Sequence, residues 1–466
     1  MSRERIKSLV LAVLVMINFV LGSKILNEKK LWPYGYNFFA FIENTDIYKA
    51  VKNNNKAVTK THITMPQQIF VNTGDQTSRI LLRPDNALFS QVYSASAETL
   101  VSALRTGSKN IRPADKEEWV SALNGKSLYF CYATEYDTKL FGEFFTSDSS
   151  DLSEFVNSFS EVIITAEKKV FFEDYTTGRF YSAVSGASTK EISAEIDKMK
   201  NETGGEIINY SVELKFDESL GGQTATLAAT APVYSTPVAL PAVRAVNPLI
   251  GISGGLDSEV TEKILSVFKI NSGNVRSYPE TDGTLVFVEN NGILKIHPGG
   301  ALEYQSTASG GFSLSADNSY VDTVIALANF TDKISAAAGT ESDFYISNKL
   351  SEKNPDVTFD CRIGGVPVKT DLYGAQNAVS AEIKNGALIR YKQILRRYVP
   401  DETDIFTLQP FITALDNAAE KYSKDMRSVE IQNIYPVYTD DGTKTFYTAD
   451  WYAQIRSIEL GGEGVR

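Results

Sequence analysis

Cysteine and histidine are scarce in this chain of 466 residues. Its only cysteines are Cys131 and Cys361, and its only histidines are His62 and His297. Two cysteines about 230 residues apart are too few for a scaffold built on disulfides. Two buried free thiols or one long-range bridge both fit the spacing. The scarcity of histidine removes the commonest general base and metal ligand from most conceivable sites.

Motifs for metal binding and nucleophilic catalysis are also missing. The sequence contains no Cys-x-x-Cys, no histidine pair and no EF-hand spacing, and neither histidine lies in a motif that would place a nucleophile. The acidic pairs Glu117-Glu118 and Asp440-Asp441 are expected on a solvated helix surface and in a solvated turn. We therefore predict no catalytic, cofactor-binding or metal site, and no enzyme activity.

Positive charge is outweighed by negative charge. The chain has 46 lysines and arginines against 57 acidic residues, which gives a net charge of -11 and a pI near 5.0. This balance argues against a nucleic-acid surface. The hydrophobic content of 43% is ordinary for a globular protein with buried cores.

Only one hydrophobic run is long enough to cross a membrane, and it covers residues 8–26. At 1.5 Å per residue this run spans about 28 Å, close to the thickness of a bilayer's hydrocarbon core. Its single charge, Lys24, lies near the end, where the side chain can reach the headgroups. The basic residues before the run favour a cytoplasmic N-terminus. We predict a single-pass protein of the cell membrane with the bulk of the chain extracytoplasmic.

A cleaved signal peptide is the alternative interpretation of this run. Val20-Leu21-Gly22, followed by Ser23, places small residues near a potential cleavage point. The bulk of Val20 and the continued apolar character at Ile25-Leu26 favour an uncleaved anchor. Either interpretation exports the rest of the chain.

One face of the predicted transmembrane helix is a candidate partner-binding site. A 3/4 spacing places five residues on this face, with Asn18 near the middle of the span. An asparagine in hydrocarbon gains from a hydrogen-bonding partner on another helix. The alternative is a tolerated polar residue without any contact. The five residues are Leu11, Leu14, Asn18, Leu21 and Ile25.

Beyond the anchor, the patterns predict an α+β fold in several domains. In the first domain, a helix over 113–123 is expected to have Pro113 in its first turn, and a hairpin over 170–184 to turn at Gly178. The predicted divisions are a cytoplasmic tail (1–7), a transmembrane helix (8–26), a juxtamembrane segment (27–63), a first α+β domain (64–220), a Pro/Ala-rich connection (221–255), a helix-plus-meander domain (256–335) and a third domain (336–466).

The second half of the chain contains two similar units, each a helix followed by an antiparallel meander. Amphipathic helices are predicted over 259–268 and 319–334, and each precedes short strands separated by turn residues. Asn291-Gly292 and Asn385-Gly386 are expected to mark hairpin turns. A final helix near 411–422 precedes two closing strands.

The segment from Gly251 to Ser258, read as GISGGLDS, resembles the pyrophosphate loop of ATP pyrophosphatases. Glycines at a helix N-terminus let backbone N–H groups approach phosphate oxygens. That family requires a parallel sheet, whereas the following residues predict antiparallel strands. We therefore favour a glycine turn into a helix, with Asp257 or Ser258 as the N-cap.

Several segments spread along the chain together resemble the YycH family. None is a catalytic signature. The segments are Arg5-Ile6-Lys7-Ser8, Glu117-Glu118-Trp119-Val120, Ser127-Leu128-Tyr129-Phe130, Arg276-Ser277-Tyr278-Pro279-Glu280-Thr281-Asp282-Gly283, Gly300-Ala301-Leu302-Glu303-Tyr304, Gly364-Gly365-Val366-Pro367-Val368, Asn385-Gly386-Ala387-Leu388-Ile389-Arg390-Tyr391, Ile434-Tyr435-Pro436-Val437-Tyr438 and Ala449-Asp450-Trp451-Tyr452.

This resemblance implies a membrane-anchored, non-enzymatic regulator of a WalK-like sensor histidine kinase of the WalK/WalR two-component system, which controls cell-wall metabolism. It also implies a YycI-like third domain, a YycI-like companion protein as a second partner, and participation of the transmembrane helix in the kinase complex. The alternative is an exported ligand-binding or inhibitor module for which the span serves only as a tether.

Overall fold

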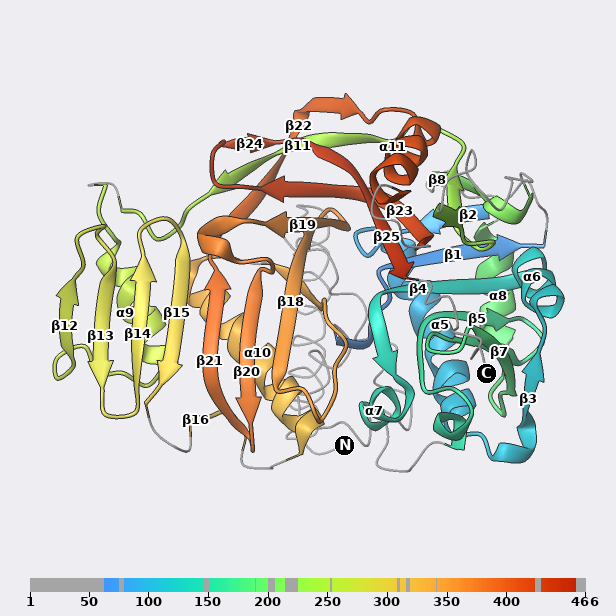
Figure 1. Cartoon of the computed structure of the whole chain (residues 1–466), viewed down its shortest axis with the longest axis horizontal. Helices are drawn as coiled ribbons and strands as arrows, with labels where there is room; N and C mark the ends of the chain where they lie inside the picture. The colour runs from blue at the N-terminus through green and yellow to red at the C-terminus, as the bar shows by residue number, and fades with distance from the viewer. Residues whose placement is uncertain are drawn as a thin grey trace, which may run out of the picture.

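The computed structural model describes most of the chain after residue 62 (Figure 1). Among the described residues, no helix is both long and apolar enough to cross a bilayer. The predicted span, residues 8–26, lies outside this part of the chain. The described residues are 63–74, 79–145, 151–188, 190–199, 206–213, 225–251, 254–307, 311–315, 319–340, 342–423 and 429–457.

The N-terminal half is built on an antiparallel sheet of nine strands. Its central strands are almost wholly buried, which explains their continuous apolar runs in the sequence. In spatial order the strands are β10 (Pro232–Tyr234), β8 (Glu206–Tyr210), β2 (Arg79–Leu82), β1 (Gln68–Thr73), β4 (Lys126–Asp137), β5 (Ser158–Thr165), β6 (Lys169–Asp174), β7 (Arg179–Val184) and β3 (Ile111–Ala114).

Four α-helices pack around this sheet: α5 (Ala87–Leu104), α6 (Lys116–Asn124), α7 (Thr138–Glu143) and α8 (Lys190–Met199). Asp115 caps α6 by accepting a hydrogen bond from the Glu118 amide at 2.8 Å. The prediction that Pro113 occupies the first turn of this helix is wrong, because Pro113 lies in strand β3. β3 is at the edge of the sheet, where a missing N–H is tolerated.

The C-terminal half is built on a mostly antiparallel sheet of 13 strands, in which β19 and β9 pair parallel to β23. This sheet takes strands from both predicted later domains, so the division at residue 335 stays a prediction. Three short strands pair with strands of the main path: β16 (Phe312–Ser313) with β21, β17 (Asp343–Ile346) with β18, and β9 (Ala225–Leu227) with β23. In spatial order, the strands of the main path are β12 (Arg276–Pro279), β13 (Leu285–Glu289), β14 (Gly292–His297), β15 (Ala301–Ser306), β21 (Ala387–Ile394), β20 (Val379–Lys384), β18 (Asp356–Ile363), β19 (Val366–Thr370), β23 (Val429–Asp440) and β25 (Ala449–Ser457).

Helices α9 (Ser258–Val267) and α10 (Tyr320–Ala338) lie behind this sheet, while its front face stays open (Figure 1). The predicted helices over 259–268 and 319–334 are therefore confirmed. Phe268 and Phe330 meet at 5.1 Å between ring centroids, and Phe330 packs at 5.5 Å against Tyr391 of β21. This aromatic core fixes both helices to one face. A third helix, α11 (Phe411–Ser423), packs on β23 and β25.

The predicted Pro/Ala-rich connection contains three strands that join three different sheets. β9 pairs with β23 of the C-terminal sheet, and β10 pairs with β8 of the N-terminal sheet. β11 (Ala239–Val246) is the centre of a three-stranded sheet with β22 (Arg397–Thr407) and β24 (Phe446–Tyr447). This small sheet arches over the molecule in Figure 1. Short 3-10 helices occur at Ser108–Asn110, Asp151–Glu154, Ser211–Glu213 and Leu372–Gly374.

The two halves meet at a seam that contains both apolar and polar contacts, such as the packing of Tyr234 of β10 on Trp451 of β25 at 5.1 Å between ring centroids. Gln68 accepts a buried hydrogen bond from the Asn433 amide at 2.8 Å, and Lys349 pairs with Glu135 at 2.5 Å. The turn at Gly365 approaches the N-terminal half so closely that a Cβ there would overlap the Asp85 carboxylate and lie 2.7 Å from Arg83 Cβ. Gly365 also has a φ of +67°, so both the close contact and the backbone conformation of this turn require glycine.

The α+β prediction is confirmed. The hairpin of β6 and β7 turns at Gly178, and the β20–β21 hairpin turns at Asn385-Gly386, where both residues have positive φ. Asp257 caps α9 by accepting a hydrogen bond from the Val260 amide at 3.0 Å. This confirms the N-cap interpretation of the GISGGLDS segment over a phosphate loop, since the strands that follow are antiparallel.

A candidate binding groove on the open sheet face

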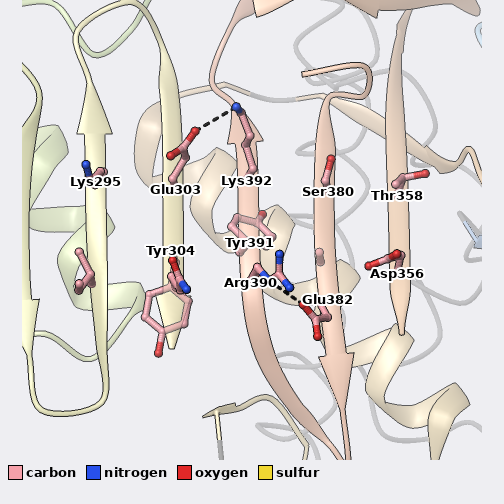
Figure 2. Close-up of a pocket in the computed structure, with 13 residues that line it drawn as sticks. Lys295, Glu303, Tyr304, Asp356, Thr358, Ser380, Glu382, Arg390, Tyr391 and Lys392 are labelled. Atoms are coloured by element: carbon pink, nitrogen blue, oxygen red, sulfur yellow. Dashed lines mark ion pairs between the residues drawn. The ribbon is translucent and has the colours of Figure 1, made fainter. Parts of the chain in front are cut away.

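A shallow groove of about 510 Å³ lies on the open face of the C-terminal sheet (Figure 2). Five neighbouring strands supply its floor, namely β14, β15, β21, β20 and β18. Because side chains alternate between the faces of a strand, every second residue points into the groove. Tyr304 and Tyr391 take part in the aromatic core with α9 and α10, whereas Glu303 and Lys392 belong to the open face.

Strand register places the groove residues in two rows that cross all five strands. Each neighbouring pair within a row consists of directly opposed cross-strand partners. The first row is Lys295, Glu303, Lys392, Ser380 and Thr358. The second row is Ile293, Gln305, Arg390, Glu382 and Asp356.

Opposite charges alternate in the charged part of the first row, and each row contains one ion pair. Lys392 Nζ lies 3.0 Å from Glu303, and Arg390 Nε lies 2.7 Å from Glu382. Lys295 Nζ reaches Glu280 at 2.7 Å, and this hydrogen bond raises the pKa of Lys295. Burial alone would raise the pKa of Glu303, but the hydrogen bond and charge of Lys392 outweigh it and lower that pKa. Opposed charges across strands stabilise the sheet only modestly.

A second feature lies beside the first row, where His297 follows Lys295 two residues further along β14. His297 lies 3.6 Å from Glu303 and shares a 3.0 Å hydrogen bond between its Nδ1 and Thr284 Oγ1. The Tyr373 ring covers His297 at 4.9 Å between centroids, and a Cβ on Gly299 would overlap that ring. Tyr373 itself has a φ of +53°, which is unusual for a residue with a side chain. Its carbonyl accepts a hydrogen bond from Lys392 at 2.7 Å.

The candidate site residues predicted from sequence are outside the part of the chain that the structure describes. The predicted transmembrane face, Leu11, Leu14, Asn18, Leu21 and Ile25, is outside the described residues, so it stays a prediction. Cys131 and Cys361 are both buried and free, which answers the question of a bridge. Within the described part of the chain, no three His, Cys, Asp or Glu side chains are grouped so that they could hold a metal ion.

One acidic pair departs from expectation. Asp441 is exposed, but Asp440 is only 1% exposed, so its predicted place in a solvated turn is wrong. It accepts a hydrogen bond from Tyr398 Oη at 3.0 Å and lies 3.6 Å from Arg396 Nε. These partners come from β22 and from the segment before it, which sequence spacing alone does not bring near Asp440.

The sequence alone also does not predict the groove. Its rows join residues as far apart in the sequence as Lys295 and Lys392, and their pairing depends on the order of the strands. The signal that was available is the charged residue between two uncharged ones in Leu302-Glu303-Tyr304 and Tyr391-Lys392-Gln393. This pattern predicts one exposed face, but not which strands lie side by side.

Comparisons with known proteins add a family and a fold. Residues 4–173 match a family model described as the N-terminal domain of YycH protein. A crystal structure of YycH from Bacillus subtilis resembles this chain with a TM-score of 0.55 and 14% identity, covering 86% of this chain and 97% of that one. None of the curated proteins that were compared matches the chain.

The two broad sheets, the arching third sheet and the open groove define an α+β protein with the fold of YycH. With the N-terminal domain match, the resemblance drawn from the sequence segments is confirmed. Residues 4–173 thus match the YycH N-terminal domain, and the chain shares the fold of YycH.

Proposed function

We propose that this protein is a membrane-anchored, non-enzymatic regulator of a WalK-like sensor histidine kinase and thereby of cell-wall metabolism. The observation that carries the proposal is the YycH N-terminal domain over residues 4–173. That match begins before the apolar run at residues 8–26 and continues into the N-terminal sheet, so it includes the predicted anchor.

The regulator acts through two sets of contacts, one inside the bilayer and one outside the cytoplasm. Within the bilayer, the face around Asn18 packs against a helix of the kinase or of a YycI-like companion, because a buried amide gains from a polar partner. Outside the cytoplasm, the folded body contacts the exported part of the same complex. The bulk of the chain is extracytoplasmic and the N-terminus is cytoplasmic.

The span provides the direct test of this proposal. The full chain and the kinase are reconstituted together in liposomes, and phosphorylation of the kinase is followed with and without the regulator. The regulator should change the level of phosphorylated kinase, and Asn18→Leu should weaken that effect. Val20→Leu is a matched control, since residue 20 lies on the opposite side of the predicted helix. An Asn18→Leu variant as effective as the unchanged chain would contradict a role for this face.

A second function is favoured by the groove. An exported, membrane-tethered binding or inhibitor module needs a recognition surface, and the groove offers paired charges on an exposed, rigid sheet. Replacing residues 8–26 with an unrelated apolar span separates the two functions. The exchange should abolish regulation through the membrane helix, whereas a tethered module would keep its activity.

A further inference from the structure

Two glutamates lie close together in the N-terminal sheet where it meets the C-terminal half. Glu161 of β5 and Glu173 of β6 follow the last paired residues, Val162 and Phe172, and their charges interact. Like charges across neighbouring strands destabilise a sheet. Glu161 is also only 8% exposed, so its carboxylate cannot be screened by water.

The C-terminal half presents one arginine to this pair. Arg456 of β25 pairs with Glu173 at 2.7 Å across the seam, and its Nε donates to Glu430 of β23 at 2.9 Å. Glu430 and Arg456 are directly opposed in the register of β23 and β25. Two carboxyl groups therefore bind one guanidinium and Glu161 lies close by, which leaves two negative charges uncompensated if all three are ionised.

The other groups that face Glu161 and its neighbours are neutral or already paired. Thr230 Oγ1 donates to Glu161 at 3.4 Å, while Tyr129 and Cys131 of β4 are buried beside it. Tyr175 stacks on the Arg456 guanidinium at 5.4 Å. Two further carboxylates stand near the cluster: Asp174 binds the Asn157 backbone amide, and Glu135 pairs with Lys349. Among these described groups, Arg456 supplies the positive charge that faces Glu173.

Burial and the charge of Glu173 raise the pKa of Glu161 to about 8. Burial also raises the pKa of Glu173, although Arg456 opposes this effect. At neutral pH, Glu161 therefore retains a proton and the seam carries one negative charge fewer.

We propose that this cluster is a proton-sensitive joint between the two halves of the protein. A protonated Glu161 keeps the nine-stranded sheet in contact with β23 and β25, and loss of that proton loosens the seam. A buried charge without a partner is costly, so a negative charge added at this cluster weakens the contact between the two halves. The inference goes beyond the proposed function and does not depend on it.

Cys131 offers a built-in probe of this joint. Register places Gln68, Cys131 and Glu161 in one row on the same face of the sheet, and Glu173 lies beside Glu161. Gln68 and Glu173, at either end of this group, bond to Asn433 and Arg456 of the C-terminal half. Opening of the seam would therefore uncover the Cys131 thiol, which is 7% exposed in the closed arrangement.

The experiment measures alkylation of Cys131 by iodoacetamide in the full chain, held in lipid nanodiscs, with peptides quantified by mass spectrometry. The unchanged protein is compared with Glu161→Gln at pH 6 and pH 9. Glutamine has the shape of the protonated acid and cannot ionise, and comparison at a single pH cancels the intrinsic reactivity of the thiol. Glu118→Gln is the control, because Glu118 is an exposed glutamate of the same half.

At pH 9 we expect Cys131 to react on the order of tenfold faster in the unchanged protein than in Glu161→Gln, and equally fast at pH 6. Equal rates at both pH values would overturn the proposal. Hydrogen exchange on the same samples separates a joint from general unfolding. At pH 9, faster exchange in the unchanged protein than in Glu161→Gln that is confined to β5, β6, β23 and β25 supports the joint, and an equal difference in β13 and β14 overturns it.

Discussion

Replacing Glu161 with glutamine should make the protein more stable at neutral and alkaline pH. Most substitutions of a buried residue destabilise a protein, so the expected sign is unusual. The stabilising sign follows from the position of Glu161. Its carboxyl group is buried near Glu173, and its pKa is raised to about 8. Glutamine preserves the shape and removes the charge.

The magnitude follows from proton linkage. The pKa of Glu161 is higher in the folded protein, at about 8, than its ordinary value of 4.5, so folding favours the protonated form. The free energy of unfolding therefore falls as the pH rises from about 4.5 to about 8 and then levels off. At pH 7 the cost is about 3 kcal/mol, since each tenfold shift in proton affinity corresponds to ~1.4 kcal/mol. Glu161→Gln removes this cost.

Thermal unfolding followed by tryptophan fluorescence from pH 5 to pH 9 measures the effect. The apparent Tm of Glu161→Gln should exceed that of the unchanged protein by about 5 °C or more at pH 8, and the two curves should converge near pH 5. Glu118→Gln, which removes an exposed carboxylate paired with Arg112, should leave Tm almost unchanged. A Glu161→Gln variant less stable than the unchanged protein at pH 8 would refute the reasoning.

Three further predictions concern the seam and the groove. Arg456→Met should lower the free energy of unfolding by about 3 kcal/mol at neutral pH, because it leaves Glu173 and Glu430 without their cation. Urea unfolding at pH 7 measures this loss, and an unchanged midpoint would contradict the prediction. In the same assay, Gly365→Ala should lower the free energy of unfolding by about 2 kcal/mol more than Gly364→Ala. Both glycines have positive φ, but only at Gly365 would an added Cβ clash with Asp85 and Arg83. Equal losses would show that the seam adjusts freely. Arg390→Gln should leave Tm almost unchanged, since the Arg390 side chain is 70% exposed. It should weaken any complex formed through the groove, which co-purification of the kinase or companion protein tests.

Local patterns predicted much of the fold. The Asn385-Gly386 turn was visible in the sequence because this dipeptide accepts the positive φ of a tight hairpin, and the structure has both residues there. The helices behind the C-terminal sheet were visible for a similar reason, since their apolar faces repeat at helical spacing. Such signals depend on neighbours in sequence and not on the rest of the fold.

Elements that depend on distant partners were missed. β22 contains Pro400 and several acidic residues, and nothing in that composition reveals its pairing with β11, more than 150 residues earlier in the chain. Asp440 was assigned to a solvated turn because its partner Tyr398 is 42 residues away. The cluster at the seam was missed for the same reason, because Glu161 and Arg456 come near each other only once both sheets have formed.

The central claim, regulation of a sensor kinase through the membrane helix, is tested most directly at position 18. A photo-crosslinking residue replaces Asn18 in the native membrane, and the adducts are identified by mass spectrometry. The account predicts an adduct with a sensor histidine kinase or a YycI-like companion protein. An intact membrane protein that forms no adduct, or a product released from the membrane without residues 1–22, would contradict it.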